Sequence, residues 1–174
     1  MKDNRYMSDI VIEKLTSDTK KLFDLYDSMG LYKTLKQKSE DISGLLENAM
    51  AENLEGAVAP KIDAEPDIRI DGEAVEIKTT SGTSWSSGLF SKREGYFLFV
   101  HYALLKDNTP EFFIAGKNLK KDDWDLPKSK NYYSTKYDKK KVYANREDWD
   151  FYQGHIEAYG PKMKFLKIHT EGYA

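Results

Sequence analysis

The chain of 174 residues contains no cysteine. This absence excludes a disulfide framework, a thiolate nucleophile and a zinc site built on cysteine, and it is compatible with a reducing cytosol. The first residues lack the apolar stretch of a signal peptide, and no apolar run approaches the length of a membrane span. We therefore expect a soluble, cytoplasmic protein with no membrane partner. The length suits one domain with a substantial core, so we predict a single domain over residues 1–174.

A strong net charge is also lacking, because the formal net charge is −2. This balance argues against a simple nucleic-acid coat, but the charge is unevenly distributed. Residues 117–146 hold ten Lys and Arg against four Asp and Glu, whereas residues 1–66 hold nine against thirteen. The basic segment also contains Tyr132, Tyr133, Tyr137 and Tyr143. It could follow a phosphate backbone, where cationic contacts supply affinity independent of sequence, or it could be an ordinary solvated loop.

The first third of the chain has the apolar periodicity of helices. Residues 8–29 have mostly helical spacing and predict one or two helices. Ser39 or Asp41 can cap a further helix that runs to about Leu54. We therefore expect a mainly helical N-terminal part.

Strands are predicted later in the chain. The largely apolar run 96–105 is long enough for a central strand, and residues 111–116 are expected to be its hairpin partner. Asn145 can cap a short helix around 146–152, and residues 163–169 alternate as a strand does. The three histidines show no spacing typical of a metal site, and His101 is expected to pack among its neighbours.

Residues 66–78, PDIRIDGEAVEIK, predict a β-hairpin. Asp71-Gly72 is a strong signal for a two-residue type I′ loop, because Gly tolerates positive φ. That loop fixes the register, so that Ile70 faces Glu73, Arg69 faces Ala74, Ile68 faces Val75 and Asp67 faces Glu76. The period of two in a strand then separates an apolar face from a polar face. The apolar face carries Ile68, Ile70, Val75 and Ile77, and the polar face carries Asp67, Arg69, Ala74, Glu76 and Lys78.

The two acids on the polar face require a physical explanation. Opposed residues have Cβ atoms about 4.5–5.5 Å apart, and like charges there are destabilising. A divalent cation reverses the sign of this interaction, and Mg²⁺ is typically held by one or two carboxylates together with waters and substrate phosphate. Lys78 could then hold a water or stabilise charge on the phosphate. The alternative is an exposed hairpin in which Arg69 and Lys78 simply neutralise the acids.

At Pro66-Asp67 and Glu76-Ile77-Lys78 the chain resembles the PD-(D/E)xK phosphodiesterase superfamily, which includes many type II restriction endonucleases, junction resolvases and repair nucleases. The resemblance implies that Asp67 and Glu76 are metal ligands, that the Ile77 carbonyl is a further ligand, and that Lys78 is the catalytic lysine.

Such families often have another acid on a helix before the hairpin. Glu47 is our candidate for this catalytic acid, and Glu40 is the weaker choice. The helix, the hairpin and the apolar run after it follow the family's core order over about half of the chain.

The resemblance implies an α/β, restriction-endonuclease-like fold with a central mixed β-sheet flanked by α-helices. The expected parts are a mainly helical region over 1–55, a catalytic β core over 64–116 and a basic DNA-contacting segment over 117–146. The implied function is Mg²⁺-dependent cleavage of double-stranded DNA by a small type II restriction endonuclease, most simply a homodimer. The alternatives are a structure-specific resolvase or repair nuclease of the same superfamily, and a noncatalytic DNA-binding or immunity-type module.

Residues 79–95 are rich in Ser, Thr and Gly and predict a loop. Because it follows the catalytic strand, we expect it to contact DNA, although it could be a flexible connection. Trp85 could wedge against bases or anchor the loop to the body of the protein. The residues expected to contact DNA are Ser81, Thr83, Ser84, Trp85, Ser87, Lys92 and Arg93, together with Lys128 and Lys130 of the basic segment.

Overall fold

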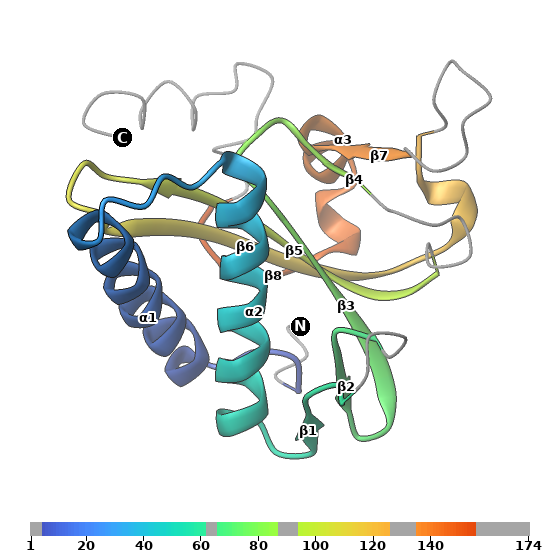
Figure 1. Ribbon diagram of the computed structural model, residues 1–174. Coiled ribbons are helices and arrows are strands. Elements are labelled where there is room, and N and C mark those ends of the chain that lie inside the picture. Colours follow the sequence, from blue (N-terminus) through green and yellow to red (C-terminus); the bar gives the residue numbers. More distant parts are fainter. Residues whose placement is uncertain (1–4, 62–65, 87–93, 126–134, 156–174) are drawn as a thin grey trace.

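The computed structural model describes residues 5–61, 66–86, 94–125 and 135–155. Two long helices, α1 (Asp9–Ser28) and α2 (Leu35–Asn53), pack against each other on one face of a central sheet (Figure 1). Residues 8–29 thus form one helix, with Ser8 as its N-cap. None of the helices in these ranges has the length and apolar character needed to cross a membrane.

The central sheet is mixed. Its order is β1-β2-β3-β5-β6-β8, with β3 and β5 parallel and each of the other neighbouring pairs antiparallel. Its strands are β1 (Ala57–Val58), β2 (Ile68–Ile70), β3 (Glu73–Thr80), β5 (Gly95–Leu104), β6 (Pro110–Leu119) and β8 (Asp150–Gln153). The predicted hairpin of two apolar strands is confirmed as β5 and β6. The protein is therefore a mixed α/β protein with a central mixed sheet flanked by helices.

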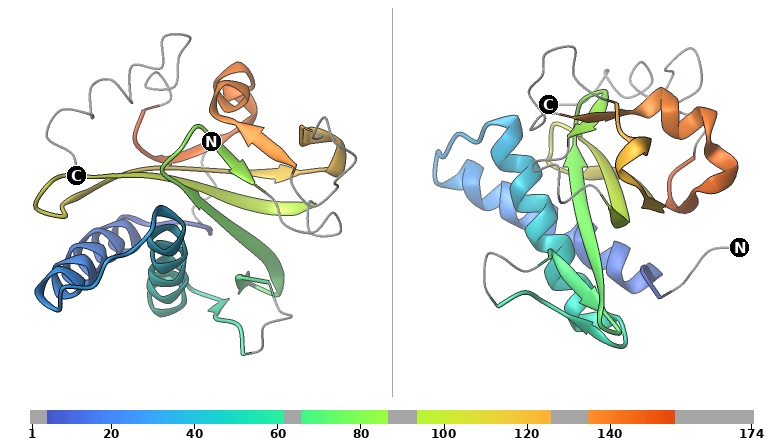
Figure 2. Two further views of the ribbon diagram at one scale, coloured as in Figure 1. Left: turned by 45° about the horizontal axis from the view of Figure 1, so that its top comes forward. Right: turned by 90° about the vertical axis from the view of Figure 1, so that its right-hand side faces the viewer.

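Smaller elements cover the other face of the sheet (Figure 2). A two-stranded sheet pairs β4 (Ser84–Ser86) with β7 (Lys136–Asp138), and the short helix α3 (Lys139–Ala144) follows. Two 3₁₀ turns, η2 (Lys121–Asp123) and η3 (Arg146–Asp148), complete this side.

The sheet separates two layers of buried side chains. Toward α1 and α2 the layer is mainly aliphatic and includes Val11, Leu15, Leu46, Met50, Ile68, Val75, Ile77 and Leu98. Toward β4, β7 and α3 it is mainly aromatic and includes Trp85, Phe97, Phe99, Phe113, Trp124, Tyr137 and Trp149. Alternation along β5 produces this division, because successive side chains of a strand point to opposite faces. His101 is fully buried, as expected for a packed residue.

Helix α2 begins earlier than predicted from Ser39 or Asp41. Thr34 is its N-cap, and its hydroxyl accepts a hydrogen bond from the Gln37 amide at 3.1 Å. The Gln37 side chain accepts one from the Thr34 amide at 2.9 Å. This reciprocal capping box satisfies two backbone donors, whereas a single cap at Ser39 would satisfy one. The Ser39 hydroxyl instead donates to the Leu35 carbonyl within the helix.

Three other expectations need correction. Within the predicted loop 79–95, residues 84–86 are strand β4, because they pair with β7. The predicted helix at 146–152 is a 3₁₀ turn followed by β8, because residues 150–153 extend the central sheet at β6. The basic segment contains the strand β7 and the helix α3, neither of which was predicted. The strand predicted at 163–169 lies outside the described residues.

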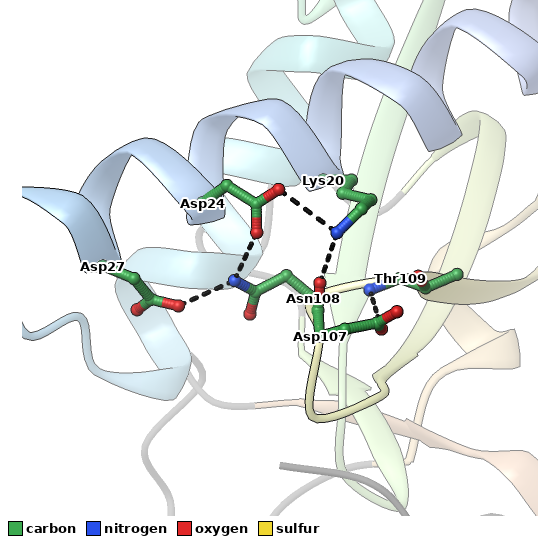
Figure 3. A network of polar contacts seen from close by, with 6 residues as sticks. All are labelled: Lys20, Asp24, Asp27, Asp107, Asn108 and Thr109. Carbon is green, nitrogen blue, oxygen red and sulfur yellow. Dashed lines mark hydrogen bonds and ion pairs between the residues drawn. The ribbon is translucent and has the colours of Figure 1, made fainter.

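Asn108 attaches the β5–β6 hairpin to α1 (Figure 3). Its backbone has φ 66°, and its amide nitrogen donates to Asp24 at 3.0 Å and to Asp27 at 2.7 Å. Lys20 pairs with Asp24 at 3.2 Å and donates to the Asp107 carbonyl. These bonds hold the far end of the hairpin against the helix, and the bond from Asn108 is the main cause of the lowered pKa of Asp24.

Candidate functional site

The hairpin of β2 and β3 has the predicted register from the loop to Ile68, whereas the expected pair of Asp67 with Glu76 lies beyond the end of β2. Asp71 and Gly72 form the loop, with φ of 51° and 81°, as a type I′ turn requires. Ile70 pairs with Glu73, Arg69 with Ala74 and Ile68 with Val75. Gly56 faces the loop so closely that a Cβ on it would lie 2.0 Å from an Asp71 carboxylate oxygen, so this turn is packed against the end of α2.

The two faces of the hairpin also differ as predicted. Ile68, Ile70, Val75 and Ile77 are buried toward the helices. Asp67, Glu76 and Lys78 are partly exposed, and Arg69 and Ala74 are exposed. A slip of one residue would bury the charged side chains and expose the aliphatic ones, so the register is strongly specified.

The Asp67 carboxylate occupies the edge of β3 where β2 begins. Its Oδ2 accepts a hydrogen bond from the Ile77 amide at 2.7 Å. Strand β2 begins at Ile68, so Pro66 and Asp67 lie outside the ladder; the alternation of the register beyond Val75 turns the Ile77 amide toward this edge. Pro66 has no N–H that it could donate to the Ile77 carbonyl. The Ile77 amide donates to the Asp67 side chain and not to a backbone carbonyl of a neighbouring strand. Because the amide and carbonyl of one strand residue point to the same side, the Ile77 carbonyl faces this edge too.

Glu47 approaches the same edge from α2. It is partly buried, and its pKa is raised from 4.5 to about 7, first by burial and second by the negative charge of Asp67. The two carboxylates are therefore close enough to repel each other. Glu40 is exposed and lies about 10 Å earlier along the helix. Of the two candidate helical acids, Glu47 is the one that meets the hairpin.

Glu76 and Lys78 project from the face of β3 that is opposite to α2. Their neighbours in the parallel register are Phe97 and Phe99, which belong to the aromatic layer. The candidate site is thus an edge reached from two sides, with Glu47 on the helix side and Glu76 and Lys78 on the other. Among the described residues, the Lys78 ammonium makes no ion pair or hydrogen bond.

The residues at this edge suit a magnesium ion. Two neighbouring carboxylates that repel each other gain from a cation, and a peptide carbonyl on the same edge adds a neutral oxygen. Mg²⁺ needs only one or two carboxylates when waters and phosphate complete its shell. No three acidic or histidine side chains gather into a metal-binding group within the described ranges, so convergence of all three acids on one ion stays a prediction.

Trp85 is buried and does not form a wedge against bases. Its side chain is 1% exposed, stacks on Phe99 with ring centroids 4.6 Å apart, and donates to the Val100 carbonyl at 2.9 Å. Of the two roles left open by the sequence, anchoring is the one that this geometry supports. An indole that is both apolar and able to donate is well satisfied in such a position.

Only some of the other residues predicted to contact DNA lie within the described part of the chain. Ser81, Thr83 and Ser84 are partly or fully exposed around β4. Because β4 pairs with β7, the two predicted DNA-contacting segments lie side by side. Ser87, Lys92, Arg93, Lys128 and Lys130 lie outside the described residues.

Two features were missed by sequence reasoning. Lys139, at the start of α3, is fully buried, and burial lowers its pKa to about 7. Its position within a run of three lysines gave no sign of this. Ser43 on α2 and Thr79 on β3 have hydroxyl oxygens 2.7 Å apart. The available signal was that Ser43 lies one helical turn before Glu47, and Thr79 directly follows Lys78.

A search against protein-family models finds no match to this chain, and a search of the curated proteins finds no significant match.

Proposed function

We propose that the protein is a Mg²⁺-dependent DNA endonuclease of the PD-(D/E)xK kind, with a restriction-endonuclease-like fold. The observation that carries the proposal is the Asp67 carboxylate bound to the Ile77 amide, beside the strand that bears Glu76 and Lys78 and with the charge of Asp67 acting on Glu47. The alternative is an exposed hairpin in which Arg69 and Lys78 merely neutralise the acids. That alternative does not explain why Glu47, a partly buried acid, lies where the charge of Asp67 acts on it.

Each residue has a distinct role in this proposal. Asp67, Glu76 and the Ile77 carbonyl would hold Mg²⁺, which when bound neutralises phosphate charge and makes a bound water more acidic. Lys78 orients the attacking water or stabilises charge on the phosphate, since its ammonium has no partner among the described residues. Glu47 adds negative charge beside the ion and binds a proton when the ion is absent.

Double-stranded DNA is the proposed substrate. Phe99, beside Lys78 in the register, stacks on Trp85 of β4, so the β4–β7 sheet covers the face from which Lys78 projects. Lys136 of β7 and Lys140 of α3 are exposed there and can contact phosphates without reading bases. Together they support a duplex bound on this side of the central sheet, with the scissile phosphate at the edge of β3.

We also propose that the active form is a homodimer that cuts a specific, two-fold symmetric site, because a dimer mirrors that symmetry. Five large apolar side chains at the α1–α2 turn are at least half exposed: Leu25, Met29, Leu31, Tyr32 and Leu35. Asp24 and Asp27 flank this surface on α1, and Lys36 flanks it on α2. A two-fold axis through the surface would place the acids of one protomer opposite the lysine of its partner.

Sedimentation equilibrium should give a dimer for the wild type and a monomer for Leu35→Glu. A monomeric wild type would contradict the dimer.

Plasmid cleavage tests the proposed function. Discrete fragments with Mg²⁺, and intact plasmid in excess chelator, are expected of a sequence-specific enzyme. Cutting confined to branched or damaged DNA would indicate the resolvase or repair alternative. DNA that is bound but intact at every metal concentration would indicate a noncatalytic DNA-binding module. Asp71→Asn is a matched control for the acidic variants, because Asp71 lies in the same hairpin, at the exposed tip.

A further inference from the structure

Ser43 and Thr79 join α2 to the strand that carries Lys78. Their hydroxyl oxygens are 2.7 Å apart, a hydrogen bond in which either can be the donor. Both side chains are partly buried. The proposed function gives neither residue a chemical role.

The Ser43–Thr79 bond lies close in sequence to two residues of the candidate site, Glu47 and Lys78. Ser43 precedes Glu47 by four residues, so both side chains lie on one face of α2, one turn apart. Thr79 follows Lys78 in β3 and shares a face with Ile77. The bond therefore ties the helix to the strand next to the helical acid, on the face that this acid approaches.

The buried side chains next to Glu47 along α2 are apolar. Leu46 and Met50 of α2 are fully buried in the layer that contains Val75 and Ile77 of β3. Apolar packing is non-directional, so it holds the helix against the sheet but tolerates small rotations. A hydrogen bond depends steeply on distance and angle, so the hydroxyl pair restrains the rotation of α2 at the turn before Glu47, as the Ser39–Tyr102 bond does one turn earlier.

We propose that the Ser43–Thr79 pair is a positioning device that sets where the Glu47 carboxylate lies relative to Asp67 and the Ile77 edge. This inference rests on the proposed function, because the purpose of the position is to bind a divalent cation. Removal of an outer partner of a metal site typically costs about 10–100-fold in affinity or activity. Since Ser43 is proposed to act through the orientation of the helix, we expect about tenfold, the lower limit.

Four substitutions in the full chain test the pair. Ser43→Ala and Thr79→Val each remove a hydroxyl, whereas Thr79→Ser keeps it. Ser39→Ala is the matched control, because Ser39 bonds to Leu35 and, like Ser43, to a hydroxyl of the sheet, that of Tyr102 in β5, but lies about two turns before Glu47. Titration with Mn²⁺ by calorimetry should show about tenfold weaker binding for Ser43→Ala and Thr79→Val, and wild-type binding for the other two. DNA cleavage should lose kcat with little change in KM, since the DNA-contacting surface is untouched.

A second readout needs no metal. Nuclear Overhauser contacts from the Glu47 side chain to the Asp67–Ile77 edge should weaken in Ser43→Ala and persist in Ser39→Ala. Equal contacts and equal Mn²⁺ affinity in these two variants would overturn the positioning role. If the wild type neither binds Mn²⁺ nor cuts DNA, the proposed function fails. In that case the metal-free contacts still decide whether the pair positions Glu47, so the two failures are distinguishable.

Discussion

The Asp67 carboxylate lies 2.7 Å from the amide nitrogen of Ile77 and takes the place of a strand neighbour. Strand β2 begins only at Ile68, so the edge of β3 beyond Val75 has no β2 residue beside it. A side chain that accepts one backbone donor satisfies that donor and leaves the neighbouring carbonyl exposed to other partners. One acidic side chain is thereby fixed beside the Glu-x-Lys strand with a defined orientation.

Asp67→Asn and Glu76→Gln should each lower DNA cleavage by at least about 100-fold, because each removes an anionic oxygen that a divalent cation needs. The fold should persist. An asparagine side-chain oxygen can still accept from the Ile77 amide, so thermal denaturation of Asp67→Asn should remain cooperative. DNA binding should survive better than cleavage, because removal of a carboxylate lessens repulsion of phosphate. Cleavage by both variants at the rate of Asp71→Asn would eliminate the proposed site.

Lys78→Ala should lose turnover while it keeps most of the affinity for Mn²⁺, because the ammonium acts on water or phosphate and does not bind the ion. Calorimetry and single-turnover cleavage, measured on the same preparation, separate these two effects. Lys21→Ala, which removes an exposed lysine of α1, is the control for a general loss of positive charge. Near-normal turnover in Lys78→Ala would leave this lysine with only the role of neutralising nearby acids.

Glu47→Gln should stabilise the metal-free protein at alkaline pH and inactivate it. The folded pKa of Glu47 is raised from 4.5 to about 7, so the native state binds more protons than the unfolded state between these values. The contribution of Glu47 to the free energy of unfolding is therefore fully present below pH about 4.5 and is lost as the pH rises through about 7. Gln carries no charge to desolvate, so at pH 8 we expect a gain of about 1–2 kcal/mol after allowance for solvent, or a few degrees in Tm.

The gain in Glu47→Gln should vanish near pH 4, where the wild-type carboxyl is protonated. Added Mg²⁺ should stabilise the wild type more than the variant, because a cation relieves the repulsion from Asp67. Glu52→Gln is the matched control, since Glu52 is an exposed acid of the same helix, paired with Lys14 at 3.5 Å. If Glu47→Gln were less stable than the wild type at pH 8 without metal, the ionised Glu47 carboxylate would not destabilise the native state.

Ca²⁺ should support DNA binding but not cleavage. It prefers more oxygen ligands at longer distances and in looser geometry than Mg²⁺, so it can shield the acids from phosphate without holding the reacting groups in place. Gel-shift and plasmid-cleavage assays with each metal measure the two properties separately. Cleavage in Ca²⁺ at the Mg²⁺ rate, or cleavage in excess chelator, would contradict the mechanism.

Local signals predicted the hairpin well. The loop Asp71-Gly72 permits only a narrow choice of turn, and the turn fixes which residues pair. The same argument predicted which side chains are buried, because burial of the aliphatic residues excludes a shifted register. The start of α2 was misplaced because Ser39 and Asp41 are good caps by residue type, whereas the cap is decided by the reciprocal bonds of Thr34 and Gln37.

The sequence by itself determined the register of the hairpin and the face on which Glu76 and Lys78 lie, since these depend on a turn and on alternation along the strands. Only the tertiary structure decided that the charge of Asp67 acts on Glu47, because this interaction joins a helix to a hairpin twenty residues later in the chain. It also decided that Trp85 is an anchor, since its partners Phe99 and Val100 lie on another strand. Such contacts depend on how whole elements pack, which local residue preferences do not specify.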